Sequence, residues 1–124
     1  MPKSILVVDD DVLVLKTMKK LFIREGYDVE IVKTAKEGLE LMRNREFNLV
    51  VCDVRMPDTD GIELIEQMRD LRKSENKPVI PFVFITGYAS EEAPIKALKL
   101  GAKDYILKPF DMDKLLESVR DNIA

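Results

Sequence analysis

Five short, mostly apolar runs rich in valine and isoleucine alternate along the chain with stretches in which apolar residues recur every three or four positions. The runs lie at residues 5–8, 29–32, 49–52, 82–85 and 105–107. Such runs are typical of strands buried on both faces of a parallel sheet, whereas the three-to-four spacing is typical of amphipathic helices. The alternation predicts one α/β domain over residues 1–124, a doubly wound sheet of five strands with five helices.

Residues with known preferences for helix ends bound several of the predicted helices. Gly26 and Gly101 follow the apolar stripes of the first and fourth helices, where glycine readily takes the left-handed terminal conformation. Thr34 and Glu37 have the spacing of a capping box, and Asp111 is placed to cap the last helix. These signals support the predicted order of elements.

The second half of the chain yields two more local predictions. The polar stretch Arg72–Pro78 predicts a connecting loop before the fourth strand. Ile95 and Leu98, together with Ala97, mark the apolar stripe of the fourth helix.

Composition narrows the functional classes. The net charge is −3 and no basic stripe is present, which argues against direct contact with nucleic acid. No apolar run approaches the roughly 20 residues of a membrane span, so we expect no membrane insertion. The absence of histidine excludes histidine metal sites and Ser/His/Asp triads. The single cysteine, Cys52, cannot form an internal disulfide; we expect it to pack as a small apolar residue in a cytoplasmic protein.

Polar residues follow directly after four of the predicted strands. They are Asp9 and Asp10, Asp53, Thr86 and Lys108. Because the carboxyl ends of parallel strands meet at one edge of a sheet, three carboxylates, a hydroxyl and an ammonium are expected in one cleft. Aspartate is a common turn residue after a strand, so the inference depends on the coincidence of all four positions.

Crowded carboxylates have a definite chemistry. Three of them either raise one pKa or recruit a cation, and oxygen ligands suit Mg²⁺. With a lysine and a hydroxyl, this set suits phosphoryl transfer, in which an aspartate can act as the nucleophile and form an acyl phosphate. Asp11, in contrast, is expected at the start of the first helix, where its charge suits the helix dipole.

Four segments resemble the receiver domain of two-component response regulators, and the chain is similar in size to single-domain chemotaxis and sporulation regulators. They are Ile5–Asp11, Asp53–Gly61, Phe84–Tyr88 and Gly101–Phe110. The resemblance implies a flavodoxin-like fold with strand order 2-1-3-4-5. It also implies a phosphorylated switch rather than an enzyme, one that catalyses only its own phosphotransfer and autodephosphorylation. The implied partners are a histidine kinase or phosphotransfer protein as donor, and a downstream protein or a removed output domain.

The resemblance assigns roles around the acceptor. Asp53 would accept the phosphoryl group from a phosphohistidine. Asp10 would bind Mg²⁺ directly, Asp9 would bind it through water or orient its shell, and Asp53 and the backbone carbonyl of Arg55 would be further ligands. Lys108 would pair with Asp53 and then with the phosphate, aided by a cis bond to the following proline.

Other implied roles concern switching and access. Thr86 would hydrogen-bond the phosphoryl oxygen, and Tyr105 would change rotamer as the face formed by the fourth helix, fifth strand and fifth helix rearranges. Gly87 would keep the acceptor accessible. Arg55 and Tyr88 flank the acceptor, and we expect the pair to set the lifetime of the phosphorylated state by screening the attacking water.

Three alternative functions fit the sequence less well. A Mg²⁺-dependent phosphohydrolase usually carries a second aspartate two positions after the nucleophile, where this chain has Arg55, and needs a cap for which the chain is too short. A flavin binder needs phosphate-binding donors where the first loop is acidic. A receiver that signals without phosphate usually lacks one of the residues described above, all of which are present.

Overall fold

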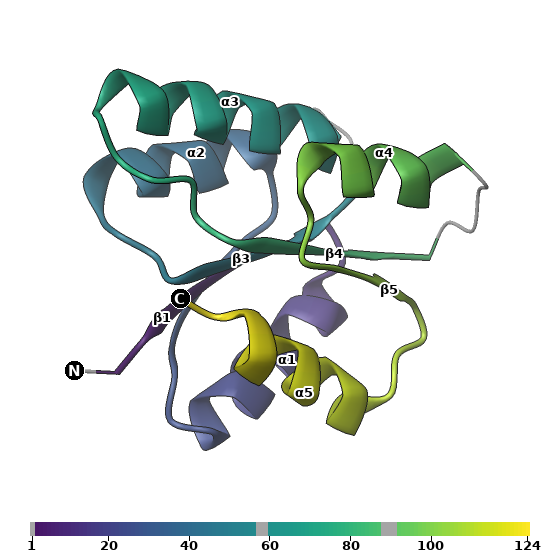
Figure 1. The fold of residues 1–124 in the computed structure, drawn as a ribbon. Helices are drawn as coiled ribbons and strands as arrows, with labels where there is room; N and C mark the ends of the chain where they lie inside the picture. The colour runs from purple at the N-terminus through teal and green to yellow at the C-terminus, as the bar shows by residue number, and fades with distance from the viewer. Residues whose placement is uncertain (1, 57–59, 88–91) are drawn as a thin grey trace.

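The architecture is a five-stranded parallel sheet with helices on both faces. The computed structural model describes residues 2–56, 60–87 and 92–124. The strands are β1 (Ser4–Val8), β2 (Asp28–Val32), β3 (Leu49–Asp53), β4 (Phe82–Thr86) and β5 (Asp104–Leu107). Their order across the sheet is β2-β1-β3-β4-β5, which confirms the expected topology (Figure 1).

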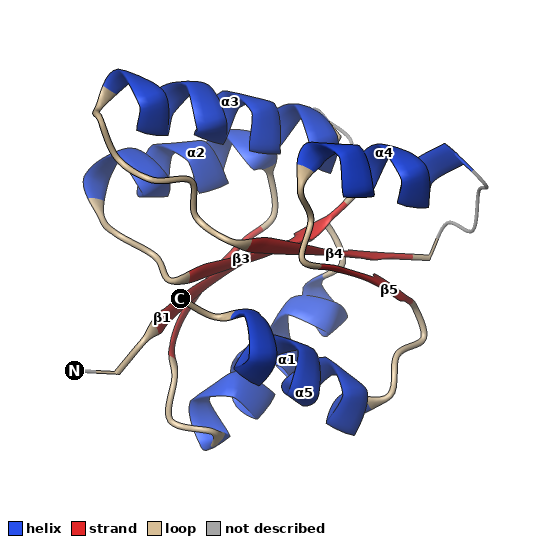
Figure 2. Cartoon of the chain, viewed as in Figure 1, coloured by secondary structure: helices blue, strands red, loops and turns tan. Residues whose placement is uncertain are grey.

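The helices divide between the two faces of the sheet. They are α1 (Val12–Arg24), α2 (Ala35–Asn44), α3 (Gly61–Ser74), α4 (Glu92–Leu100) and α5 (Met112–Asn122). Helices α1 and α5 cover one face, and α2, α3 and α4 cover the other (Figure 2). Within the described ranges, no helix has the length and apolar character needed to cross a membrane.

The two-layer burial explains why the strands are apolar at consecutive positions. Leu6 and Val8 of β1 belong to the core under α2 and α3, whereas Ile5 and Val7 belong to the core under α1 and α5. Successive side chains of a strand point to opposite faces, so both sets must be apolar when both faces are covered. The edge strand β5 differs: none of its four residues is buried, whereas all five residues of β3 and of β4 are.

The predicted helix ends are confirmed. The carboxylate of Asp11 accepts hydrogen bonds from the backbone N–H groups of Leu13 (2.9 Å) and Val14 (3.4 Å), so Asp11 is the N-cap of α1. Thr34 caps α2 and Asp111 caps α5 in the same way. Gly26 and Gly101 have φ of 90° and 93°, the left-handed conformation expected after α1 and α4.

Two local predictions are wrong. Arg72 does not begin a loop, because α3 continues to Ser74 and the Arg72 side chain is buried. Its Nε donates to the carbonyl of Pro78 (2.7 Å) and its guanidinium pairs with Glu46, so a buried hydrogen-bonded cation extends the helix. Leu98 does not face the core: it is 71% exposed, whereas the neighbouring Ala97 is fully buried. The side chain of Ile95 lies outside the described residues.

Replacing Arg72 should lower stability measurably. We expect Arg72→Met to reduce the free energy of unfolding by about 2 kcal/mol, because the buried contacts to Pro78 and Glu46 are lost together. Urea unfolding followed by circular dichroism measures this. The matched control is Lys73→Met, at the next and exposed position of α3, which should change stability by less than about 0.5 kcal/mol.

The Arg72 contact should also depend on pH. Its hydrogen bond is the main cause that holds the pKa of the Glu46 carboxyl below its ordinary value. A lowered pKa means that ionised Glu46 stabilises the fold above its ordinary pKa, and that this contribution is lost as the pH falls through the lowered value. The stability difference between the wild type and Arg72→Met should therefore shrink in acid. A difference that stays constant from neutral pH to about pH 3 would contradict this account.

Candidate functional site

The candidate site lies at the carboxyl ends of the central strands β1, β3 and β4. The last described pair of the β1–β3 ladder comes immediately before Asp9 and Asp53, which therefore lie side by side at the carboxyl edge of the sheet. Thr86 is the last residue of β4, and its carbonyl accepts a hydrogen bond from the backbone N–H of Lys108 (2.8 Å). The sheet thus brings together the strand-end residues that the sequence singled out.

Lys108 bridges the two central carboxylates. Its Nζ lies 2.7 Å from Asp9 Oδ2 and 3.0 Å from Asp53 Oδ2. Asp9 is fully buried, Asp53 is almost so, and the Lys108 side chain is 19% exposed. The ammonium therefore partly neutralises two adjacent charges that have little water around them. The expected cis peptide bond between Lys108 and Pro109 is present.

The remaining carboxylate oxygens are held by backbone groups. Asp9 Oδ1 accepts from the N–H of Asp11 (2.9 Å), and Asp53 Oδ1 accepts from the N–H of Arg55 (3.2 Å). Asp9 Oδ2 is buried and accepts no well-aligned hydrogen bond within the described part of the chain; its contact with Lys108 is one of charge. The positive charge of Lys108 thus offsets part of the cost of burying this oxygen.

The pKa values of the bridged groups follow from burial and charge. Burial is the largest influence on Asp9 and raises its pKa, and the charge of Asp53 adds to the increase, whereas Lys108 and the N–H of Asp11 act against it. Burial alone would lower the pKa of Lys108, but its contacts with Asp9 and Asp53 outweigh burial and the pKa is raised. Lys108 therefore remains cationic at neutral pH.

Three carboxylates in this cleft fit a divalent cation. Asp9, Asp10 and Asp53 each offer one oxygen, and the three oxygens lie within 4.8 Å of one another. Asp10 is exposed, so the cluster opens to solvent on that side. A set of three carboxylate oxygens suits a hard ion such as Mg²⁺. The predicted residues Asp9, Asp10 and Asp53 therefore form a group that could hold a metal.

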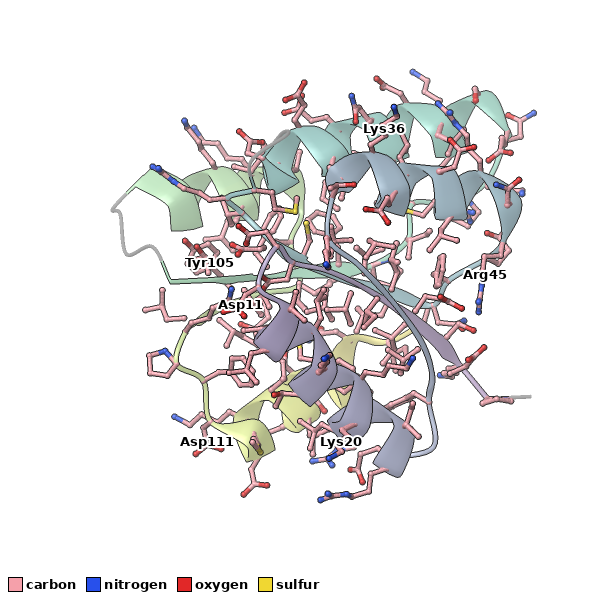
Figure 3. The ribbon with its side chains drawn as sticks, turned by 180° about the vertical axis from the view of Figure 1, so that it is seen from behind. Asp11, Lys20, Lys36, Arg45, Tyr105 and Asp111 are labelled. Carbon is pink, nitrogen blue, oxygen red and sulfur yellow. The ribbon has the colours of Figure 1, made fainter. Side chains whose placement is uncertain are left out.

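The other predicted site residues lie at the same edge. Thr86 is fully buried, and Arg55 and Gly87 are exposed. Tyr105 lies half-buried on β5, and its pKa is raised first by burial and then by the charge of Asp53. Figure 3 shows Tyr105 at the same end of the molecule as the start of α1. Tyr88 lies outside the described residues.

Gly61 is a site-forming residue that the sequence interpretation missed. Its N–H donates to the carbonyl of Val54 (2.7 Å), and a Cβ at this position would lie 2.2 Å from the backbone oxygen of Asp53. Only glycine lets α3 approach the backbone of Asp53 so closely. The signal in the sequence was a glycine directly after the helix N-cap Asp60, a position where close approach of another backbone is one reason for glycine.

Cys52 packs as predicted. It is fully buried, its thiol donates to the carbonyl of Asp53 (3.2 Å), and burial raises its pKa well above the ordinary value. Since the thiolate is the reactive form, this group is inert at neutral pH.

Comparison with known proteins assigns the family. Residues 5–120 match the response regulator receiver domain family. The transcriptional regulatory protein ZraR of Escherichia coli O157:H7 is 39% identical over 121 residues, which cover 98% of this chain and 26% of that protein. The response regulator MprA of Mycobacterium sp. (strain KMS) is 36% identical over 120 residues, covering 97% of this chain and 50% of that protein. The chain thus spans between a quarter and half of these relatives.

Solved structures show the same likeness. The CheY-like response regulator receiver domain protein of Methanospirillum hungatei JF-1 superposes with a TM-score of 0.88 at 40% identity, covering 98% of this chain and 93% of that one. A putative response regulator of Chloroflexus aurantiacus J-10-fl gives 0.86 at 27% identity, covering 98% and 97%. With the acidic cluster and the bridging lysine at the expected strand ends, the chain belongs to the response regulator receiver domain family of two-component signalling.

Proposed function

We propose that Asp53 is the phosphoryl acceptor of this receiver domain. The observation that supports the proposal is the contact of Lys108 Nζ with both Asp53 and buried Asp9, beside the exposed carboxylate of Asp10. One oxygen of Asp53 attacks the phosphorus of a phosphohistidine on a partner kinase or phosphotransfer protein. The carboxyl–phosphate bond forms as the phosphorus–nitrogen bond breaks, and the imidazole leaves with the donor.

The carboxylates beside Asp53 would bind the metal ion needed for this transfer. Asp10 and Asp9 would hold Mg²⁺ together with Asp53 and the backbone carbonyl of Arg55, and the ion, when bound, supplies charge neutralisation for the transferring phosphoryl group. Lys108 already lies against the acceptor, so its ammonium keeps contact with the new phosphoryl oxygens after transfer.

Switching follows from the new charge on Asp53. Phosphorylation adds about −1.5 to −2 charges and three acceptor oxygens. The Thr86 hydroxyl moves to donate to one of these oxygens, and Tyr105 takes the space that Thr86 leaves. The α4-β5-α5 face is thereby altered, and a downstream protein or an output domain responds to it. The first of the relatives is a transcriptional regulatory protein in which the matched segment covers 26% of the length, which supports an output domain as one recipient of the signal.

The central test is phosphorylation by a small acyl phosphate. We expect incubation with the acyl phosphate and Mg²⁺ to add the mass of one phosphoryl group, measured on the intact protein, and we expect a chelator to abolish the addition. Sustained release of phosphate from many monoesters would instead favour a Mg²⁺-dependent hydrolase. If no phosphoryl group is added even in the presence of Mg²⁺, the proposal is wrong.

The lifetime of the phosphorylated state should depend on the residues flanking the acceptor. We expect both Arg55→Asn and Tyr88→Ala to accelerate autodephosphorylation several-fold, because each opens a path for the attacking water. Loss of the phosphorylated mass after the donor is removed measures the rate. Arg55 is exposed, so Arg55→Asn should fold normally. Unchanged rates in both variants would remove this role.

A further inference from the structure

A groove lies where α3 leads into β4, at the amino edge of the sheet. It consists of two adjoining hollows of about 580 Å³ and about 440 Å³ that share Arg69 and Val79. We call it the α3–β4 groove, and the lining residues that matter are Arg69, Asp70, Lys73, Lys77, Val79 and Lys103. Phe82, the first residue of β4, lies beneath it, whereas Thr86 at the other end of β4 belongs to the proposed phosphorylation site. From Phe82 to Thr86 the strand rises about 13 Å, which separates the two regions.

The groove offers an ordered apolar segment. Val79 is 44% exposed, although the next residue, Ile80, is buried at 2%. Pro78 and Pro81 fix φ on either side, and the carbonyl of Pro78 is held by Arg72 (2.7 Å). Little conformational entropy remains to be lost when a partner covers Val79. The segment is therefore suited to packing against an incoming apolar side chain.

The rim of the groove is cationic, although the chain as a whole is acidic. Arg69, Lys73, Lys77 and Lys103 lie around it, and Asp70 is the one acidic side chain among the described lining residues. Lys77 is already paired with Glu46 (3.6 Å). Lys73 and Lys103 are exposed and form no ion pair within the described ranges, and the backbone N–H of Lys103 fixes it beside the carbonyl of Phe82 (2.9 Å). These two lysines therefore present available positive charge.

We propose that the α3–β4 groove binds an extended acidic peptide segment of a partner protein. Charge complementarity identifies the occupant: carboxylates contact Lys73 and Lys103 while an apolar side chain covers Val79. Nucleic acid fits less well, because the net charge of −3 repels a polyanion and the one aromatic lining residue, Phe82, is buried and offers no stacking face. The groove is remote from Asp53, so binding does not require phosphorylation.

Fluorescence anisotropy with a labelled nine-residue peptide of alternating glutamate and leucine tests the proposal. We expect saturable binding with Kd below about 1 mM, weakened by added salt. The double variant Lys73→Glu/Lys103→Glu should weaken binding at least about tenfold, and Val79→Ser should weaken it about threefold. Asp53→Asn should bind the peptide as tightly as the wild type, which separates this inference from the proposed function.

The matched control is Lys33→Glu/Lys114→Glu, the same charge change at two exposed positions that do not line the groove. It should bind the peptide almost as the wild type does. The proposal is overturned by absence of binding at 1 mM protein, by equal weakening in the two double variants, or by tighter binding of a nine-nucleotide single strand than of the peptide. Circular dichroism confirms that each variant is folded.

Discussion

Asp53→Asn should abolish the gain of a phosphoryl group from an acyl phosphate, whatever the Mg²⁺ concentration. The amide is nearly the same size as the carboxylate but is a poor nucleophile, so the acceptor is lost while the shape of the site is kept. Lys108 retains its contact with Asp9, 2.7 Å away, and the pocket stays filled. The intact mass of the variant after incubation measures the outcome.

The matched control for this variant is Asp11→Asn. Asp11 lies near the cluster but is the N-cap of α1, and asparagine caps a helix as well as aspartate does. This variant should therefore fold and become phosphorylated like the wild type. Persistent single, Mg²⁺-dependent phosphorylation of Asp53→Asn would place the acceptor on another residue.

Gly61→Ala should be the most destabilising of the substitutions considered. A Cβ at this position would meet the backbone oxygen of Asp53 at 2.2 Å and Cys52 Sγ at 2.9 Å, and a backbone oxygen cannot move aside as the end of a flexible side chain can. Helix α3 must then shift away from the end of β3. We expect a loss of about 3 kcal/mol in the free energy of unfolding, or a fall in Tm of about 10–15 °C.

Gly87→Ala provides the comparison. A Cβ there meets nothing within 4 Å among the described residues, and the position is exposed. Its Tm should stay within about 3 °C of the wild type. If the two glycine variants melted at the same temperature, the close approach of α3 to Asp53 would not be the reason for a glycine at position 61.

Features that depend on neighbouring residues or on the order of the strands could be predicted from the sequence. The apolar runs predicted all five strands, and the cap residues Thr34, Asp111, Gly26 and Gly101 act as their types suggest. The juxtaposition of Asp9, Asp53, Thr86 and Lys108 followed from parallel topology, because that topology fixes which strand ends meet.

Features that depend on contacts between distant segments could not be predicted in this way. Arg72 is polar in sequence, yet the carbonyl of Pro78 and the carboxylate of Glu46 allow it to be buried within α3. Leu98 is apolar, yet it lies on the outer side of α4, and only the position of the helix over the sheet determines that. The close approach at Gly61 likewise depends on where α3 meets β3. The roles of Arg55, Thr86 and Tyr105 in phosphoryl chemistry remain predictions.

The contrast between β3 and β5 implies uneven resistance to local opening. Asp53 ends a strand that is buried throughout and pairs with a strand on each side. Tyr105 belongs to an edge strand, which pairs with one strand and has no buried residue. Backbone amides of β3 should therefore exchange with deuterium only on global unfolding. Those of β5 should also exchange through local opening, which has a lower free energy than global unfolding. The sheet thus combines a rigid central strand, which carries the proposed phosphoryl acceptor, with a more easily opened edge strand, which carries the proposed switch residue.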